Sequence, residues 1–306
     1  MSQCALNAKP QSNGTCLTDE HISIIEEYTG NTISDITKNC SNEDNINECI
    51  IDNSKAPDDI KLKIKIEALK APTSSVDEKY WLDNTEIDTI MCQFRKMNNG
   101  FAHSCIHMSD LVMIPPKIID AFDYHIYPVT DIDFANEFKH ALHKRGIISN
   151  DADNFTPKLS TYNDKPLKSY GVIFNTDSSK GRGKHWFCIF ISTDQKDPDN
   201  THKPWIRIEL FNSGGGGCSS AVFNKFWAQT ATNIAKATGL KCTYDIITNL
   251  QHQSSETGNC GSYSLFYIYA RCDGGIPSDF DKSNKKITDA EMTNFRLVCF
   301  EKKETY

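Results

Sequence analysis

The chain has 306 residues, of which 39% are hydrophobic and 24% charged, and its formal net charge is −7. This composition is ordinary for a globular protein with a hydrophobic core, and the length predicts one large domain or a domain with an appendage. Because an acidic surface repels phosphate backbones, we expect no nucleic acid partner. No apolar run approaches the ~20 residues that cross a bilayer. The start of the chain lacks a basic region followed by an apolar core, so we expect no membrane contact and no signal peptide.

Twelve cysteines are spread along the chain without a Cys-x-x-Cys pair. Since structural zinc sites usually contain such pairs, the sequence lacks the common zinc signature. The one tight Cys/His cluster is His103-Ser-Cys105-Ile-His107, and we favour packing in or beside the core over metal binding for it. We therefore expect no metal and no cofactor. In a long chain without an export signal, we expect reduced thiols in a cytosol-like compartment.

Residues 1–75 differ in composition from the rest, with twelve Asp or Glu, seven Lys and no Arg, Trp or Phe. Short helices are predicted over residues 19–28, 42–52 and 58–69. Residues 70–75, Lys-Ala-Pro-Thr-Ser-Ser, are typical of a linker. We expect a small helical N-terminal appendage over 1–75. Without aromatic anchors it should lean on the main body, residues 76–306, or stay mobile, because it cannot hold a core of its own.

The main body is predicted to have an α+β fold, with a central mixed or antiparallel sheet packed against helices. Helices are predicted over residues 83–94, 134–143, 219–237, 260–272 and 288–300. Runs of β-branched and aromatic residues predict strands over residues 112–119, 171–174, 185–192, 205–211 and 240–247. Residues 194–204 contain two prolines and predict a long connection between two strands. The helix over 260–272 is apolar on most faces, so we expect it to be buried.

Cys260 opens this buried helix, which points to nucleophilic chemistry. The thiolate form attacks a carbonyl, and the positive end of a helix dipole lowers a thiol pKa. Gly261 removes a side chain that would crowd the substrate. His185, in Gly183-Lys-His185-Trp186, precedes a strand and is the candidate general base.

Two further residues complete the candidate constellation. Asn212 ends the strand predicted to lie beside the one that begins at His185, so its amide could orient the imidazole, although a neutral amide cannot neutralise an imidazolium. Gln253 could donate its side-chain amide to an oxyanion, with the backbone N–H of Cys260 as a second donor. Gln251 is a rival for the Gln253 role. Taken alone, each residue is more often structural, and it is the order and context that favour catalysis.

The order His-Trp, strand-end Asp or Asn, Gln and Cys-Gly resembles the adenovirus-protease and SUMO-specific-protease clan of cysteine peptidases, in the branch that includes the polyprotein-processing protease of African swine fever virus. The resemblance covers residues 165–300 well and 76–165 weakly, and 1–75 only as an extra N-terminal segment. The segments that carry it are Asn175-Thr-Asp177, Gly183-Lys-His185-Trp186, Phe211-Asn212-Ser213, His252-Gln253, Cys260-Gly261, Tyr263-Ser-Leu-Phe-Tyr-Ile268, Ala270-Arg271 and Ile287-Thr-Asp289. Trp81-Leu-Asp-Asn84 is similar to the Trp-Leu-Asn-Asp motif of the SUMO proteases.

The resemblance implies that Trp186 and Trp81 wall a narrow channel that admits only glycine, so that family members favour Gly-Gly near the scissile bond. The sequence departs from the family pattern twice. The spacing from His185 to Asn212 is longer than usual, which indicates a longer hairpin. The stretch from Gln253 to Cys260 is one residue longer than in the swine fever enzyme and is similar to the adenovirus spacing.

The resemblance implies a cysteine endopeptidase that cleaves viral structural polyproteins at Gly-Gly-x sites during virion maturation, in the host cytoplasm and the virion. Its partner would be a protein substrate carrying Gly-Gly. Three alternatives stay open: a protease specific for SUMO- or ubiquitin-like modifiers, which the Trp81 motif favours somewhat, an acyltransferase, and a non-catalytic binding module of the same fold.

Overall fold

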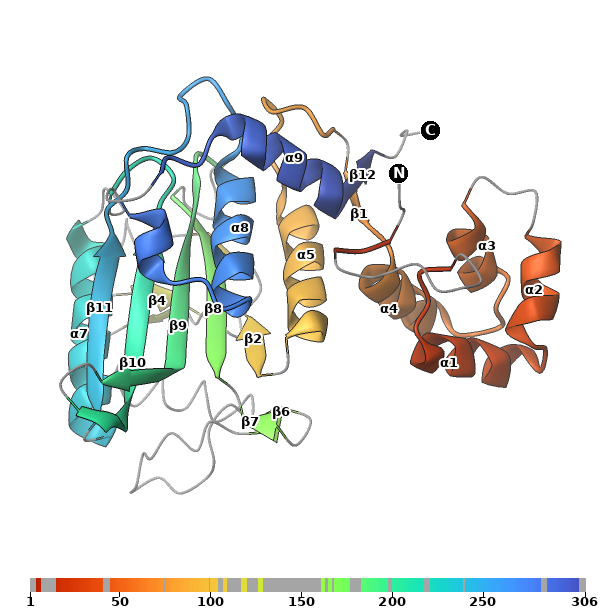
Figure 1. Ribbon diagram of the computed structural model, residues 1–306, viewed down its shortest axis with the longest axis horizontal. Coiled ribbons are helices and arrows are strands. Elements are labelled where there is room, and N and C mark those ends of the chain that lie inside the picture. The colour runs from red at the N-terminus through yellow and green to blue at the C-terminus, as the bar shows by residue number, and fades with distance from the viewer. Residues whose placement is uncertain are drawn as a thin grey trace. The chain divides into compact units, whose positions relative to one another are not determined.

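The structure is a computed structural model that describes residues 4–6, 15–40, 45–73, 75–98, 100–103, 107–108, 117–119, 126–128, 161–162, 165–166, 168–176, 183–197, 200–216, 221–238, 240–281 and 285–302 (Figure 1). Its contacts divide the chain into two compact units, residues 1–76 with 294–306 and residues 77–293. The sequence analysis assigned 294–306 to the main body. They belong to the N-terminal unit because β12 (Phe300–Lys302) pairs in parallel with β1 (Ala71–Thr73). The predicted linker therefore contains a strand.

The N-terminal unit contains four short helices. They are α1 (Asp19–Thr29), α2 (Ile33–Asn39), α3 (Ile46–Asp52) and α4 (Asp58–Ala68). Helices α1, α3 and α4 confirm the predicted helices, whereas α2 was missed. It has only seven residues, and a side-chain cap from Thr32 to the N–H of Asp35 begins it. Of its residues Ile36 is the one that is buried, so the segment shows no repeated apolar spacing.

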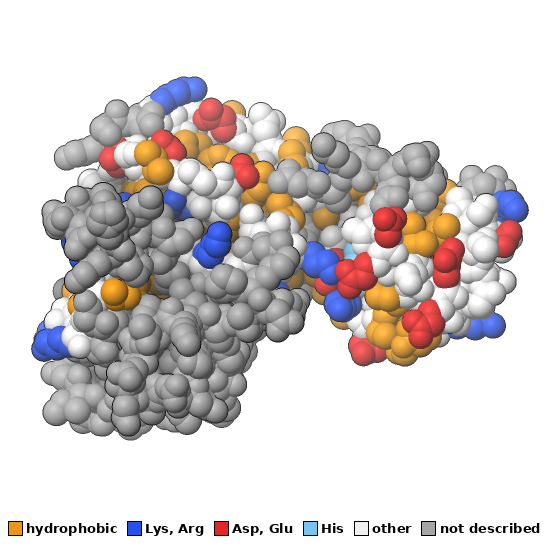
Figure 2. All heavy atoms as spheres, turned by 60° about the horizontal axis from the view of Figure 1, so that its bottom comes forward, with side chains coloured by type: hydrophobic (Ala, Val, Ile, Leu, Met, Phe, Trp, Pro, Cys, Tyr) orange, Lys and Arg blue, Asp and Glu red, His pale blue; other side chains and the backbone are white. Residues whose placement is uncertain are grey.

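The N-terminal unit holds a core of its own, contrary to the expectation from its composition. Two disulfides, Cys4–Cys16 and Cys40–Cys49, join its segments, so the expectation of reduced thiols is wrong for these four cysteines. The buried aliphatic residues around them include Leu17, Ile25, Ile36, Ile50, Ile51, Ile64 and Leu69. Cross-links stabilise small units with little apolar surface to bury, which helps to explain how this core forms largely from aliphatic residues. Figure 2 shows acidic side chains over its surface, with hydrophobic side chains between them.

The main unit is built on a mixed sheet in the order β11-β10-β9-β8-β2, with β3 also paired to β8. These strands are β2 (Phe101–His103), β3 (His107–Met108), β8 (Ser169–Asn175), β9 (Trp186–Asp197), β10 (Asn200–Phe211) and β11 (Lys241–Ile247). The pairs β8–β9 and β9–β10 are antiparallel, and the outer strands add in parallel. The predicted α+β fold with a mixed sheet is confirmed.

The two faces of this sheet are covered by different helices. On one face, α7 (Ala221–Thr238) packs in an aromatic cluster formed by Phe174, Phe187, Phe223 and Trp227. On the other face, α8 (Cys260–Cys272) stacks Tyr267 on Phe211 and lies over β9. Helix α5 (Asn84–Met97) packs beside α8 and β2 (Figure 1). Strand β8 is buried almost throughout, which is why it reads as a continuous apolar run.

The predicted connection over residues 194–204 is largely strand. Strand β9 continues to Asp197, and strand β10 begins at Asn200. The long spacing from His185 to Asn212 is therefore a long hairpin, as the sequence indicated. A register shift between Asn200 and Pro204 accommodates the proline, which cannot donate to a ladder.

The remaining elements are short or lie near the end of the chain. They are β4 (Lys117–Ile119) paired with β5 (Ile126–Pro128), β6 (Thr161–Tyr162) paired with β7 (Lys165–Pro166), the 3-10 helix η2 (Pro277–Phe280) and α9 (Asp289–Cys299). Helix α9 begins with the predicted capping box of Thr288 and Glu291. The predicted helix over 134–143 and most of the predicted strand over 112–119 lie outside the described residues. Within the described part of the chain, no helix is long and apolar enough to cross a membrane.

Candidate active site

The antiparallel pairing of β9 and β10 brings His185 and Asn212 together. Cys188 lies opposite Phe211, so the residue before β9 and the residue after β10 meet at one edge of the sheet. Nε2 of His185 lies 2.7 Å from Oδ1 of Asn212. The predicted His185–Asn212 pair is thus present. Because Asn212 is neutral, its amide can orient the imidazole without adding a charge.

A second contact defines the tautomer of this imidazole. The backbone N–H of Gly214 donates to Oδ1 of Asn212 at 2.9 Å, so this atom is an acceptor and Nε2 of His185 must be the donor. Nδ1 then carries the lone pair and is the ring atom that can accept a proton from a thiol. Burial lowers the pKa of His185, and the Asn212 hydrogen bond only partly offsets it, so the neutral ring predominates at neutral pH.

Backbone and side-chain contacts hold the segment before His185 against β8. Oδ1 of Asn175 accepts from the N–H of Lys184 at 3.0 Å, and the N–H of Thr176 donates to the carbonyl of His185 at 2.9 Å. Gly183 has a φ of 85°, and a Cβ there would lie 3.1 Å from Nδ2 of Asn175. The turn therefore needs glycine for both conformation and space.

Cys260 is the first residue of α8 and is buried, as predicted. Its neighbour Gly261 connects it to the other site elements, since a Cβ on Gly261 would lie 3.3 Å from Cδ1 of Trp186 and 3.3 Å from Cδ1 of Ile87. The residue after the candidate nucleophile thus packs on the residue after the candidate base. Nε1 of Trp186 donates to the carbonyl of Leu82 at 3.0 Å, which holds the Trp186 ring in place beside Gly261.

The loop that leads into α8 is organised by Asp289, whose role the sequence analysis missed. One carboxylate oxygen accepts from Thr257 Oγ1 at 2.8 Å and from Asn259 Nδ2 at 3.2 Å, and the other accepts from the N–H of Ser254 at 2.8 Å. Asp289 is thus a positioning residue for the segment that ends at Cys260. The only sequence signal was its place in the Ile287-Thr-Asp289 segment.

Gln253 and Gln251 differ sharply in their surroundings. Gln253 is buried, its Oε1 accepts from Ser213 Oγ at 2.8 Å, and its Nε2 donates to the carbonyl of Thr257 at 2.8 Å. One hydrogen on Nε2 remains for an oxyanion. Gln251 is exposed, with a φ of 55°. These surroundings favour Gln253 as the donor.

Asn249 and Ser213 support the same edge; the sequence analysis assigned no role to Asn249 and included Ser213 only in the Phe211-Asn212-Ser213 segment. Nδ2 of Asn249 donates to the carbonyl of Asn212 at 2.7 Å, and its Oδ1 accepts from the N–H of Gln251 at 2.9 Å. The N–H of Gln253 donates to the carbonyl of Ser213 at 3.1 Å. The loops that carry Asn212 and Gln253 are therefore joined to each other.

Trp81 is 45% exposed and lies beside the loop before Cys260. A Cβ on Gly258 would collide with the Trp81 ring, and the N–H of Gly258 donates to the carbonyl of Glu78 at 2.7 Å. Trp186, in contrast, is only 4% exposed. Of the two tryptophans predicted to bind substrate, Trp81 is the one that presents a free ring surface.

Glu209, on the strand that leads to Asn212, is engaged away from His185. Its carboxylate is fully buried and accepts from Arg271 Nε at 2.8 Å and Nη2 at 2.9 Å, and from Tyr267 Oη at 2.8 Å. This network fills the sheet face under α8. Side chains alternate along a strand, so residues two apart share a face. Asn212 comes three residues after Glu209, just past the end of β10, so its side chain does not share the face of Glu209.

The described chain thus combines a mixed sheet, the His185–Asn212 pair at one edge of it, and a buried helix that begins with Cys260. No protein-family model matches the chain. Over 140 residues, the chain is 37% identical to a protein named as a SUMO-1 cysteine protease of African swine fever virus (isolate Pig/Kenya/KEN-50/1950). It is 36% identical over 140 residues to the protein named as a cysteine protease in the Badajoz 1971 Vero-adapted strain of the same virus.

These matches cover 44% of the chain and 45% of each relative, so they span less than half the length of the curated relatives. The crystal structure of an African swine fever virus protease is similar over 99% of this chain and 96% of that one, with a TM-score of 0.60 at 23% identity. This likeness confirms the fold, and the sequence matches to the two viral proteins confirm the predicted resemblance.

Proposed function

We propose that this protein is a cysteine endopeptidase in which Cys260 is the nucleophile and His185 the general base. The observation that carries the proposal is the His185–Asn212 hydrogen bond at the sheet edge, with Trp186 packed against Gly261. The names of the relatives, cysteine proteases of a virus, support it.

In the first half of the reaction, the thiol proton of Cys260 moves to Nδ1 of His185 as Sγ attacks the scissile carbonyl carbon. Because burial favours the neutral ring, His185 is able to accept this proton at neutral pH, and proton transfer accompanies attack. The carbonyl oxygen becomes an oxyanion that accepts from Gln253 Nε2–H and the backbone N–H of Cys260.

The tetrahedral intermediate then collapses, the C–N bond breaks, and His185 returns the proton to the leaving amine. Water attacks the thioester while His185 takes its proton, and the thiolate leaves and is reprotonated. Asn212 holds Nε2–H throughout, so that Nδ1 keeps facing the reacting atoms. The α8 dipole stabilises the thiolate whenever it forms.

The proposed substrate is a viral structural polyprotein with a Gly-Gly-x site, processed in the host cytoplasm and in the virion. Trp186 packs against Gly261, and the exposed Trp81 lies beside Gly258 in the loop before Cys260, which supports a narrow channel that admits only glycine beside the cut. A protease for SUMO- or ubiquitin-like modifiers is the second candidate, because relatives carry the name SUMO-1 cysteine protease and Trp81 is exposed.

The test uses a Gly-Gly peptide with an electrophilic warhead on the full chain. Covalent labelling that is lost in Cys260→Ala and kept in Cys242→Ser supports the enzyme, since Cys242 is a half-buried thiol on β11. If the folded chain is not labelled, the result contradicts the proposed enzyme and favours a non-catalytic binding module of the same fold. Cleavage of a Gly-Gly-x peptide without cleavage of a SUMO fusion favours the polyprotein substrate, and the reverse favours the modifier.

We also propose that residues 1–75 are not part of the catalytic machinery and instead assist substrate recognition or stability. The candidate catalytic residues all lie beyond residue 180. If so, a folded variant without this segment still cleaves a short peptide but processes a protein substrate poorly or unfolds more readily. Loss of cleavage of the short peptide by the folded variant contradicts this.

A further inference from the structure

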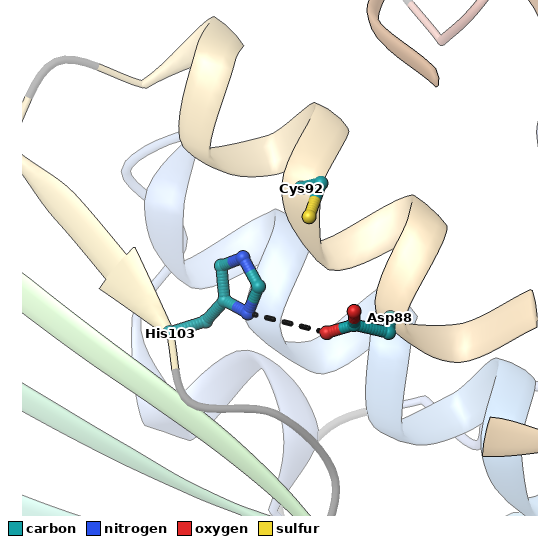
Figure 3. A group of neighbouring side chains, drawn as sticks. All are labelled: Asp88, Cys92 and His103. Carbon is teal, nitrogen blue, oxygen red and sulfur yellow. Dashed lines mark ion pairs between the residues drawn. The ribbon is translucent and has the colours of Figure 1, made fainter. Parts of the chain in front are cut away.

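Three metal-binding side chains meet between α5 and β2, apart from the proposed hydrolytic site. Asp88 and Cys92 lie one turn apart on α5, and His103 ends β2 (Figure 3). The three donor atoms all lie within 4.8 Å of one another, and Nδ1 of His103 is 3.8 Å from Oδ1 of Asp88. In Figure 3 the thiol and the carboxylate both face the imidazole.

Regular secondary structure holds these donors in place. Residues four apart share one face of a helix, so Asp88 and Cys92 point the same way. His103 lies opposite Gly171 in the β2–β8 pairing, and its ring stacks on Phe101 at 6.3 Å between centroids. The side chain of His103 is only 5% exposed. A site on a helix and a paired strand is more rigid than one on loops.

The donor set matches one class of ion. Thiolate and imidazole together with one carboxylate are ligands that zinc accepts, with bonds of about 2.0–2.3 Å. Tetrahedral donors at such bond lengths lie roughly 3.3–3.6 Å apart, so the observed group must close by about 1 Å, which side-chain rotations allow. Oδ1 of Asp88 is buried and accepts no hydrogen bond from the described part of the chain, as expected for an atom placed to meet a cation.

We propose that Asp88, Cys92 and His103 bind one Zn²⁺, with the fourth coordination position taken by water. The sequence analysis considered His103 only with its strand neighbours Cys105 and His107 and expected no metal. Cys105 lies outside the described residues, and the structure brings His103 to a different pair. The pair was hidden because partners on a separate helix upstream form no compact motif with His103.

The bound ion would tie α5 to β2. Helix α5 also carries Ile87, which borders Gly261, so the ion would stiffen the wall behind Cys260 without touching substrate. The expected consequence is a gain in stability on metal binding, since a ligand that binds only the folded state stabilises it.

Cobalt titration of the full chain tests the site, because a Co²⁺–thiolate bond absorbs in the near ultraviolet. The background is Cys260→Ala, which removes the proposed nucleophile as a competing ligand. We expect one equivalent of Co²⁺ with a thiolate band, displaced by Zn²⁺, and a higher unfolding temperature with Zn²⁺. In Cys92→Ser the band should vanish, and in Asp88→Asn the affinity should fall at least about tenfold.

Cys242→Ser is the matched control, because Cys242, like Cys92, is a half-buried cysteine outside the disulfides. It should keep the band, the stoichiometry and the thermal shift. A band that persists in Cys92→Ser, or no stoichiometric binding by the Cys260→Ala chain, overturns the proposal. The readouts do not involve hydrolysis, so they stand or fall apart from the proposed protease activity.

Discussion

Replacing Gln253 with alanine separates the oxyanion donor from the other roles of its loop. In the structure Gln253 Nε2 donates to the carbonyl of Thr257, and its second hydrogen is available for the oxyanion. Losing one such donor lowers kcat by about 10²–10³, or about 2.7–4 kcal/mol of transition-state stabilisation. KM should change little, because Asp289 still holds Thr257 and Ser254.

The same substitution also has a stability cost. Ser213 Oγ and the carbonyl of Thr257 each lose a buried partner, which costs about 1–3 kcal/mol of folding free energy for such groups. The assay is steady-state cleavage of a Gly-Gly-x peptide at a temperature where circular dichroism shows that the variant is folded. Gln251→Ala is the control and should stay near wild-type turnover, since Gln251 is exposed.

If Gln251→Ala shows the large loss and Gln253→Ala does not, the donor is misassigned. If Gln253→Ala loses affinity but not kcat, its amide acts in the ground state and the oxyanion reasoning fails.

Cys260→Ala and His185→Ala should each abolish peptide cleavage, with the double variant no worse, because residues acting as one unit are not additive; near-normal turnover in either single variant would refute the assignment. Asn212→Ala should be milder, and Asn212→Asp should keep activity while raising the pKa of His185, since a nearby anion favours the imidazolium; complete loss in Asn212→Asp would mean that a neutral amide is required. In the pH profile of kcat/KM, the acidic limb should lie below the ordinary histidine value of 6.5, because burial lowers the pKa of His185 and protonation disables the base only below it; a limb above 6.5 contradicts this. Gly258→Ala should lower stability by about 1–3 kcal/mol by overpacking, since its Cβ would lie 2.8 Å from the carbonyl oxygen of Tyr80; an unchanged unfolding midpoint would show that the loop can move.

The parts of the fold that sequence predicted well have strong local signals. The α5 face with Ile87, Ile90 and Phe94 is buried as its spacing indicated, and α8 has the predicted bounds. Strands β8, β9, β10 and β11 were found because β-branched and aromatic runs mark buried strands, whereas the short β2 and β3 were not predicted. Helix α2, with seven residues, and the three-residue pair of β1 and β12 gave no comparable signal.

The candidate site was predictable where residues neighbour each other through adjacent strands. His185 and Asn212 belong to the two ends of one hairpin, so pairing alone brings them together. The carboxylate of Asp289 reaches the Thr257 loop across 32 positions, which no local pattern contains. The Cys40–Cys49 disulfide could not be predicted from the sequence either, because disulfide pairing depends on which thiols the fold brings together.

The parallel pairing of β1 with β12 makes the main unit an insertion within the N-terminal one. More than two hundred residues separate the two strands, so during synthesis the first unit stays incomplete until the ribosome has delivered the region around Phe300. Contacts of such long range form late, because the closing loop is large. A tag fused near β12, or a deletion that removes it, would therefore disturb the distant N-terminal fold as well as the neighbouring sequence.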